Sequence, residues 1–299
     1  MPFNIIRADI TKVRADVVVK AENNGGETGS AKFTKGRRNT IHTVCPIWNG
    51  RENGEEDLLY SCYKNSFELA AENKCKSIAF PLIPVGTFGC PKEKALAVAQ
   101  RAISNFLKSS ECELFVTLVL FENGAAKLNV DLADKIQRYI AENYSEERPE
   151  YDNMHTGKPF DFHGSNPHSF APGINMGKLK ERLKNQDISF SQKLMKMIDE
   201  RGLTDSEVYK AANFSKQVFS KIRSDKNYHP KKSTALAFAV ALKLTLAETD
   251  ELLECAGYTL TRSDKTDIIV SYFIESGNYN IFEINTVLFD YNLPLLGSV

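Results

Sequence analysis

The chain has 299 residues, of which 42% are hydrophobic and 25% charged, a composition typical of a globular protein rather than a disordered or fibrous one. Basic and acidic residues number 38 each, so net charge points to neither nucleic acid nor membrane as a partner. Six scattered cysteines without a CxxC pair predict reduced thiols, and neither a disulfide framework nor a zinc site. No signal peptide or membrane span is recognisable, which predicts a cytoplasmic protein with no membrane partner.

In the first half of the chain, short runs rich in β-branched residues alternate with helical patterns. The runs are 3–7, 17–21, 41–45, 77–82 and 114–121. Apolar residues recur at helical spacing over 59–70, 96–107 and 131–144. Strands that alternate with helices predict an α/β fold, here a three-layer sandwich with the sheet between helices.

A turn that contains two glycines follows the fourth run, in the sequence SIAFPLIPVGTFGCPKE from Ser77 to Glu93. Gly86 can adopt a positive φ and let a ligand approach the backbone, and consecutive N–H groups before the following helix favour an anion. Phe88, between Gly86 and Gly89, offers an apolar face to a sugar. The turn therefore predicts a sugar-phosphate site, although an ordinary strand-to-helix loop would show the same spacing.

This turn and three other segments, in the same order, resemble a macro domain, a module that binds ADP-ribose and in some members cleaves it from proteins or small esters. The other segments are FNIIRADITK at the amino terminus, ETGSAKFTKG with IHTVCPIW, and the helical EEDLLYSCYKNSFELA. Several ordered segments are more specific than one short motif. The resemblance implies a macro-like domain over residues 1–144.

The resemblance also implies which residues bind the ligand. They are Asp9, Ile10, Asn23, Gly86, Thr87, Phe88, Gly89 and Phe121. Asp9 would accept a hydrogen bond from the adenine amino group, and Phe121 would pack on the adenine ring. The main chain from Gly86 to Gly89 would hold the diphosphate and distal ribose, and Asn23 would contact that ribose. Asp9 could instead only cap the next turn, and Phe121 could belong to the core.

One part of the family pattern is absent. Members usually pass from a strand ending in NAAN through a glycine-rich first loop and a helix to ETG, whereas VVVKAENN here runs directly into GGETG. Lys20 and Glu22 replace the usual Asn and Ala. The acidic residue that the first loop carries in hydrolytic members has no counterpart. The catalytic residues are therefore unknown, and Asn23 is the candidate that the resemblance leaves.

Residues 145–177 lack periodicity and are rich in Pro, Gly, Ser and Asn, which predicts a flexible linker. His155, His163 and His168 fall in this segment at irregular spacing without a partner cysteine, so we expect no metal site. Residues 178–299 carry helical patterns only, which predicts a separate all-α domain. Thr204 with Glu207 forms a capping box that begins one of its helices.

The segment from Gly202 to Arg223 resembles phage-repressor-like helix-turn-helix domains in its small Ala212 and its capped third helix. Residues 178–242 contain fourteen basic and seven acidic residues, whereas 243–299 contain three and nine. Such a basic region suits neutralisation of DNA phosphates, although a solvated basic face or a protein-binding surface would look the same. The predicted DNA contacts are Lys216, Lys221 and Arg223 to phosphates and Gln217 and Ser220 to bases.

Three functions remain open. The leading hypothesis is a reduced macro domain that reads ADP-ribose or a related nucleotide and is joined to a DNA- or protein-binding helical domain. The alternatives are a macro-type ADP-ribosyl hydrolase and an interaction scaffold whose ligand site does not function. None of these hypotheses requires a cofactor.

Overall fold

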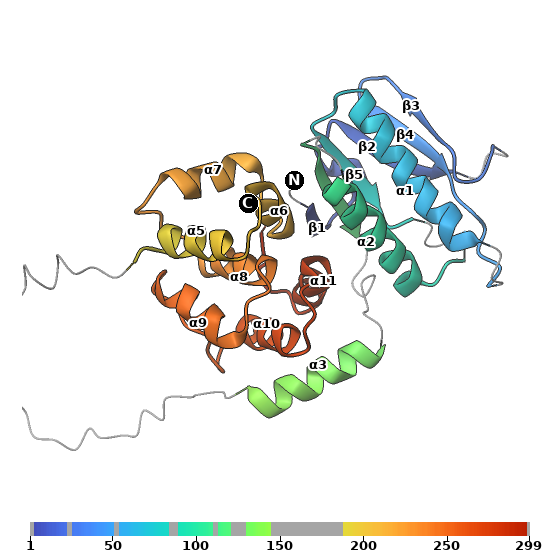
Figure 1. Cartoon of the computed structure of the whole chain (residues 1–299). Helices are drawn as coiled ribbons and strands as arrows, with labels where there is room; N and C mark the ends of the chain where they lie inside the picture. Colours follow the sequence, from blue (N-terminus) through green and yellow to red (C-terminus); the bar gives the residue numbers. More distant parts are fainter. Residues whose placement is uncertain are drawn as a thin grey trace, which may run out of the picture.

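The computed structural model describes residues 3–22, 26–50, 54–83, 89–109, 113–120, 130–144 and 188–297. The described residues form one six-stranded sheet (Figure 1), with the strand order β1-β6-β5-β2-β4-β3. They are β1 (Phe3–Arg7), β2 (Val17–Glu22), β3 (Ala31–Thr34), β4 (Asn39–Val44), β5 (Ser77–Pro81) and β6 (Phe115–Leu120). Neighbouring strands are parallel except β3, which runs antiparallel to β4.

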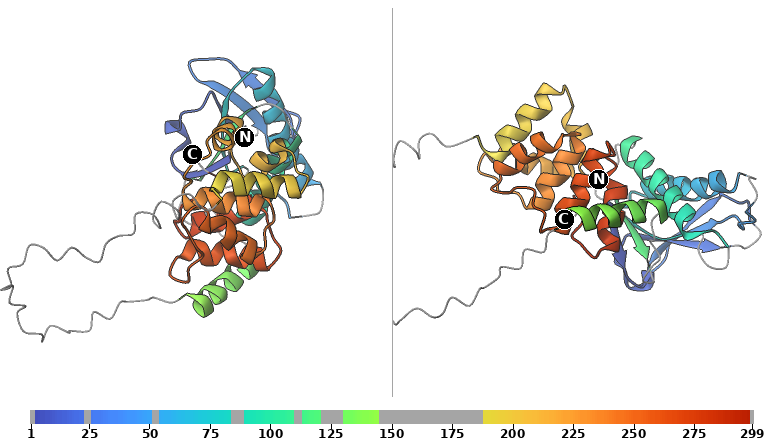
Figure 2. Two further views of the ribbon diagram at one scale, coloured as in Figure 1. Left: turned by 60° about the vertical axis from the view of Figure 1, so that its left-hand side comes forward. Right: turned by 90° about the horizontal axis from the view of Figure 1, so that it is seen from below.

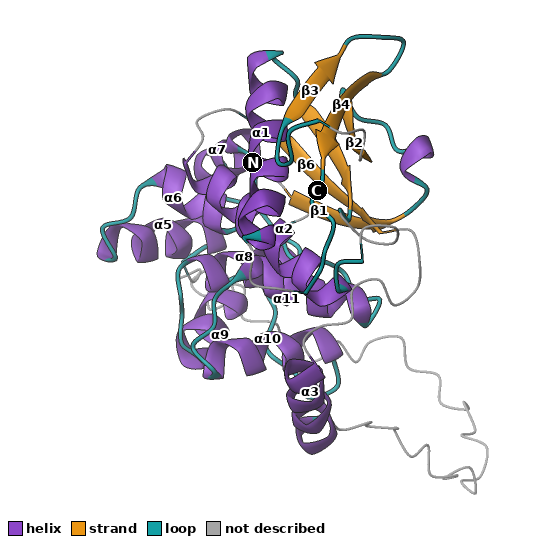
Figure 3. Ribbon diagram, turned by 90° about the vertical axis from the view of Figure 1, so that its right-hand side faces the viewer, coloured by secondary structure: helices purple, strands orange, loops and turns teal. Residues whose placement is uncertain are grey.

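Helices α1 (Glu55–Glu72) and α2 (Lys92–Ser109) lie on the same side of the sheet (Figure 3). The apolar residues of α1 that recur at helical spacing, among them Leu59, Tyr63 and Phe67, are completely buried against the strands. Phe67 also stacks on Phe106 of α2, with ring centroids 4.4 Å apart. This layer is the one that the helical spacing of the sequence predicts.

The opposite face of the sheet carries a much smaller apolar cluster. Val18, Ala79 and Val119 are buried there under Ile10 and Val13. These two residues come from the segment after β1, which includes the short 3-10 helix η1 (Ile10–Lys12). In the described part of the chain, η1 and its flanking loop therefore occupy the place of the second helical layer that we expected.

The rest of the described chain is helical. Its helices are α3 (Val130–Asn143), α5 (Phe190–Glu200), α6 (Asp205–Ala211), α7 (Lys216–Ser224), α8 (Lys232–Ala241), α9 (Leu246–Glu254), α10 (Lys265–Glu275) and α11 (Ile281–Asp290). The predicted capping box of Thr204 and Glu207 begins α6. Phe190, Phe214 and Phe219 surround Phe238 of α8 in the centre of this helical half, with centroid distances between 5.1 and 6.4 Å.

The sheet and the helical half pack against each other, whereas the sequence led us to expect a separate bundle. Their buried residues form one continuous hydrophobic cluster. Phe3 of β1 packs on Phe282 of α11, with ring centroids 5.2 Å apart. Helix α3 lies beside α10 rather than on the sheet (Figures 1 and 2), and Tyr139 of α3 donates a 2.9 Å hydrogen bond to Glu275.

Asn213, in the turn between α6 and α7, forms the centre of this junction. Its Oδ1 accepts from the Phe3 N–H at 2.6 Å, and its Nδ2 donates to the Phe3 carbonyl at 2.9 Å. The same Nδ2 lies 3.5 Å from the carbonyl oxygen of Leu296 in the C-terminal tail. The Asn213 side chain thus joins the edge strand β1, the α6–α7 turn and the tail.

Candidate functional site

The predicted ligand residues follow strands that end at one edge of the sheet. Strands β1, β2, β5 and β6 are mutually parallel, so their carboxyl ends lie together, where open α/β sheets bind ligands. The structure describes Asp9, Ile10 and Gly89 at this edge. The other predicted residues are outside the described part of the chain; they are Asn23, Gly86, Thr87, Phe88 and Phe121.

The two carboxylate oxygens of Asp9 differ in their hydrogen bonds within the described structure. Oδ1 caps η1 by accepting from the Thr11 N–H at 2.8 Å and the Thr11 hydroxyl at 2.7 Å. No described residue donates to Oδ2. The Thr11 hydroxyl and N–H, aided by nearby Lys12 and Arg38, lower the pKa of the Asp9 carboxyl. Asp9 is therefore a fixed, ionised hydrogen-bond acceptor at the sheet edge, so capping and ligand binding are compatible.

Arg38, just before β4, holds the turn that carries Asp9. Its guanidinium donates to the carbonyls of Thr11 at 2.6 Å and Ile10 at 3.0 Å, and to that of Val13. Because one guanidinium binds three backbone carbonyls, Arg38 fixes the path of the backbone after β1. Sequence reasoning missed Arg38, because an arginine between two predicted segments carries no signal for partners 25 to 28 residues earlier.

Gly89, at the end of the predicted ligand loop, has a φ of +73°, a region that glycine adopts without strain. A Cβ at this position would lie 3.4 Å from the Trp48 carbonyl oxygen, so the loop returns close to the segment after β4. Cys90 next to it is buried, and this burial raises its thiol pKa to about 11. The thiol is therefore protonated at neutral pH and is a poor nucleophile.

The connection from β2 to β3 is short. Strand β2 ends at Glu22 and β3 begins at Ala31, and the described residues 26–30 between them form no helix. Gly29, with a φ of +88°, donates its N–H to the Val44 carbonyl at 2.8 Å. Its own carbonyl accepts a 2.7 Å hydrogen bond from Asn65 of α1. The predicted ETG glycine thus anchors this connection to β4 and α1.

The predicted DNA-binding residues all lie on α7 and are exposed. Ser215 caps this helix by accepting a hydrogen bond from the Val218 N–H. Gln217 donates a 2.9 Å hydrogen bond to Glu113, the residue two positions before β6, and Arg223 forms an ion pair with Asp205 of α6. Lys216 and Lys221 form no ion pair with any residue that the structure describes.

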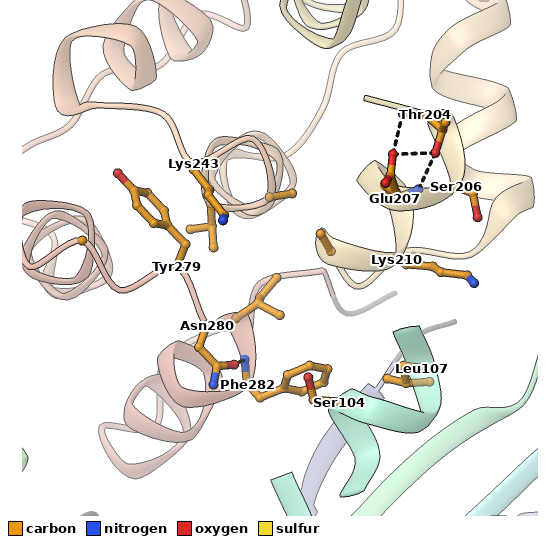
Figure 4. A pocket seen from close by; sticks show the side chains of 15 residues that line it. Ser104, Leu107, Thr204, Ser206, Glu207, Lys210, Lys243, Tyr279, Asn280 and Phe282 are labelled. Carbon is orange, nitrogen blue, oxygen red and sulfur yellow. Dashed lines mark hydrogen bonds between the residues drawn. The ribbon is translucent and has the colours of Figure 1, made fainter. Parts of the chain in front are cut away.

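A cavity of about 780 Å³ lies between α2 and the helical half (Figure 4). Ser104 and Leu107 of α2 line one side, and the lining also includes Lys210 of α6 and Lys243 in the turn after α8. None of the predicted ligand-binding residues that the structure describes, Asp9, Ile10 and Gly89, lines it. Over the described ranges, no cluster of His, Cys, Asp and Glu suits a metal ion, and no helix is long and apolar enough to cross a bilayer.

Comparison with known proteins places this site in a family. The family model described as "Macro domain" matches residues 11–99. A macro domain-containing protein of Methanosarcina mazei is 36% identical over 157 positions, which cover 42% of this chain and 84% of the relative. A macro domain-containing protein of Mesorhizobium japonicum is 35% identical over positions that cover 42% of this chain and 90% of the relative.

An O-acetyl-ADP-ribose deacetylase of Klebsiella pneumoniae is 42% identical over 88 residues, which are 29% of this chain and half of the enzyme. A solved Oceanobacillus iheyensis macrodomain with ADP is 30% identical, covers 46% of this chain and 90% of that one, and gives a TM-score of 0.38. The Methanosarcina and Mesorhizobium proteins match over most of their own length. Through its N-terminal region, the chain belongs to the macro domain family.

Proposed function

We propose that the macro region binds ADP-ribose or a closely related nucleotide. The observation that carries this proposal is the Asp9 carboxylate, which is fixed at the sheet edge by Thr11 and Arg38. Its Oδ2 accepts no hydrogen bond from a described residue, so this oxygen can accept one from the adenine amino group. The family match supports the same ligand class, since relatives include O-acetyl-ADP-ribose deacetylases. Calorimetric titration with ADP-ribose tests it, with an expected affinity between millimolar and micromolar, or about −4 to −8 kcal/mol.

The proposal includes the loss of the family's first ligand loop. The Methanosarcina match spans 157 positions, but 42% of 299 residues is about 126, so about 31 aligned positions lack a counterpart here. The short connection between Glu22 and Ala31 supports a deletion at this point. Without that loop the ligand makes fewer hydrogen bonds and stays more hydrated, which is why we expect weak binding.

The same loss predicts that the protein does not hydrolyse ADP-ribosyl esters. Hydrolysis requires a positioned water and a distal ribose held in reactive geometry, and misplacement alone can cost about a hundredfold in rate. Incubation with an ADP-ribosylated protein or with O-acetyl-ADP-ribose should release product at the uncatalysed rate, measured by chromatography. Release that exceeds background and disappears in Asn23→Ala would favour the hydrolase hypothesis instead.

As a second function, we propose that α7 contacts duplex DNA. Its support is the exposed position of Lys216, Ser220 and Lys221 on a capped helix that follows a tight turn. The hydrogen bond from Gln217 to Glu113 must open before the Gln217 amide can pair with a base. We expect Gln217→Ala and Ser220→Ala to change sequence preference rather than overall affinity.

The salt dependence of DNA binding tests the role of α7. Each phosphate that a lysine neutralises adds about −0.9 to the slope of log affinity against log salt, so Lys221→Gln should flatten it by about one unit. Fluorescence anisotropy with the full chain measures this slope, because the helices share a core with the sheet. An unchanged slope in Lys221→Gln would mean that this face of α7 does not touch DNA.

A further inference from the structure

The sheet face opposite α1 and α2, which we call the open face, is basic where it crosses β2, β4 and β3. Side chains alternate between faces along a strand, and Val18 belongs to the cluster under η1, so Lys20 lies on that same face. Lys20 and Lys32 both pair in register with His42 of β4. The three side chains therefore form a row across the open face.

Further exposed cations surround this row. Arg38 reaches over the open face to the carbonyls of η1, and other basic residues flank η1 or lie in the β3–β4 turn. The complete set of exposed cations is Lys12, Arg14, Lys20, Lys32, Lys35, Arg37 and Arg38. The sheet thus brings together basic residues that are scattered over 27 positions of the sequence.

The acidic residues nearby are already engaged. Asp9 caps η1 through Thr11, and Glu22 contacts Nδ1 of His42. Asp16 accepts the main-chain N–H groups of residues 76 and 77 at 2.7 and 3.1 Å. Glu27, exposed in the β2–β3 connection, is the other carboxylate between residues 8 and 44. Seven cations against four carboxylates between residues 8 and 44 leave this surface with a net charge of +3.

Ion pairing differs between the two sides of the sheet. On the helix-covered side, Lys64 pairs with Glu68, and Lys94 and Arg101 pair with acidic residues of α1. On and around the open face, none of the seven cations forms an ion pair with a residue that the structure describes. A surface that only needed to be soluble would mix both charges, as the helix-covered side does.

We propose that the open face docks on the sugar-phosphate backbone of duplex DNA, independently of α7. Lys20 and Lys32 lie two strand spacings apart, about 10 Å, which lets them contact separate phosphates. Surfaces for single strands stack bases on aromatic rings. The described open face of β2, β4 and β3 has no Phe, Tyr or Trp, since Phe33 belongs to the core packed against the opposite face. A duplex is therefore the better fit, bound without base readout.

The open face and α7 can be tested separately. Strands β3 and β4 form the side of the sheet remote from the helical half, whereas β1 lies at the junction (Figure 1). The triple variant Lys216→Gln/Lys221→Gln/Arg223→Gln removes the predicted phosphate contacts of α7, and Lys20→Gln/Lys32→Gln removes two open-face contacts. Lys64→Gln/Lys74→Gln is the matched control, because it changes charge equally at exposed lysines of α1 and the turn after it.

The affinity of each variant for a labelled duplex is measured by fluorescence anisotropy at several salt concentrations. Thermal melting checks that each variant is folded. In the α7 variant we expect residual duplex binding. Adding the open-face substitutions should flatten its log–log salt slope by about two units, and adding the control substitutions should leave it unchanged.

Three results would overturn the proposal. The first is loss of all duplex binding in the α7 variant, and the second is an unchanged slope after Lys20→Gln/Lys32→Gln. The third is tighter binding of single-stranded DNA or polyglutamate than of duplex, with loss on the same substitutions, which would assign the surface to another polyanion. Because every variant is compared without ADP-ribose, failure of the nucleotide-binding proposal does not affect this test.

Discussion

Replacing Asn213 by alanine should destabilise the protein by about 3 kcal/mol or more, measured by urea denaturation of the full chain. The Asn213 side chain is 1% exposed and pairs with both main-chain polar groups of Phe3. Each buried group left without a partner costs about 1–3 kcal/mol. Asn213 also has a φ of +61°, a conformation that alanine adopts at a further cost of about 1–2 kcal/mol.

Two further variants separate these causes. Asn213→Gly removes the hydrogen bonds but tolerates the positive φ, so it should lose most of the stability that Asn213→Ala loses. Lys243→Gly changes an exposed residue with a φ of +52°, and it should be neutral or slightly stabilising. If Asn213→Gly is as stable as the unmodified protein, the Asn213 side chain does not hold the junction.

Gly86→Val should abolish ADP-ribose binding. The resemblance assigns Gly86 to the turn whose main chain approaches the diphosphate, and a branched side chain there would occupy the space of the ligand. The expected change is from measurable heat in a calorimetric titration to none at the same concentrations. Gly36→Val is the control, because a Cβ at Gly36 would make only ordinary contact, 3.6 Å from the Arg38 carbonyl oxygen. Equal affinities of Gly86→Val and the unmodified protein would remove this loop from the site.

Local patterns in the sequence predicted the individual elements well. Apolar spacing identified the buried face of α1, including Cys62 and Ala70, which are both 0% exposed. The Thr204–Glu207 capping box and the positive φ of Gly202 mark the start of α6 and the end of α5. These features depend on residues three or four positions apart, so the sequence order alone makes them visible.

Long-range features were not predictable in this way. Strand β3 has four residues, and its alternation of Lys32 with Phe33 is too short to be distinguished from a loop. The junction depends on the contact between Asn213 and Phe3, 210 positions apart, which no periodicity reveals. The basic open face likewise appears only when sheet pairing brings Lys20 next to His42 and Lys32.

Calorimetric titration of the full chain with ADP-ribose tests most directly the claim that a macro domain with a shortened first loop still binds this nucleotide. We predict one site per chain with an affinity between millimolar and micromolar. Asp9→Asn, which keeps an oxygen for the Thr11 cap but loses the carboxylate charge, should weaken binding. No heat at millimolar ligand, or an affinity unaffected by Asp9→Asn and Gly86→Val, would contradict the account.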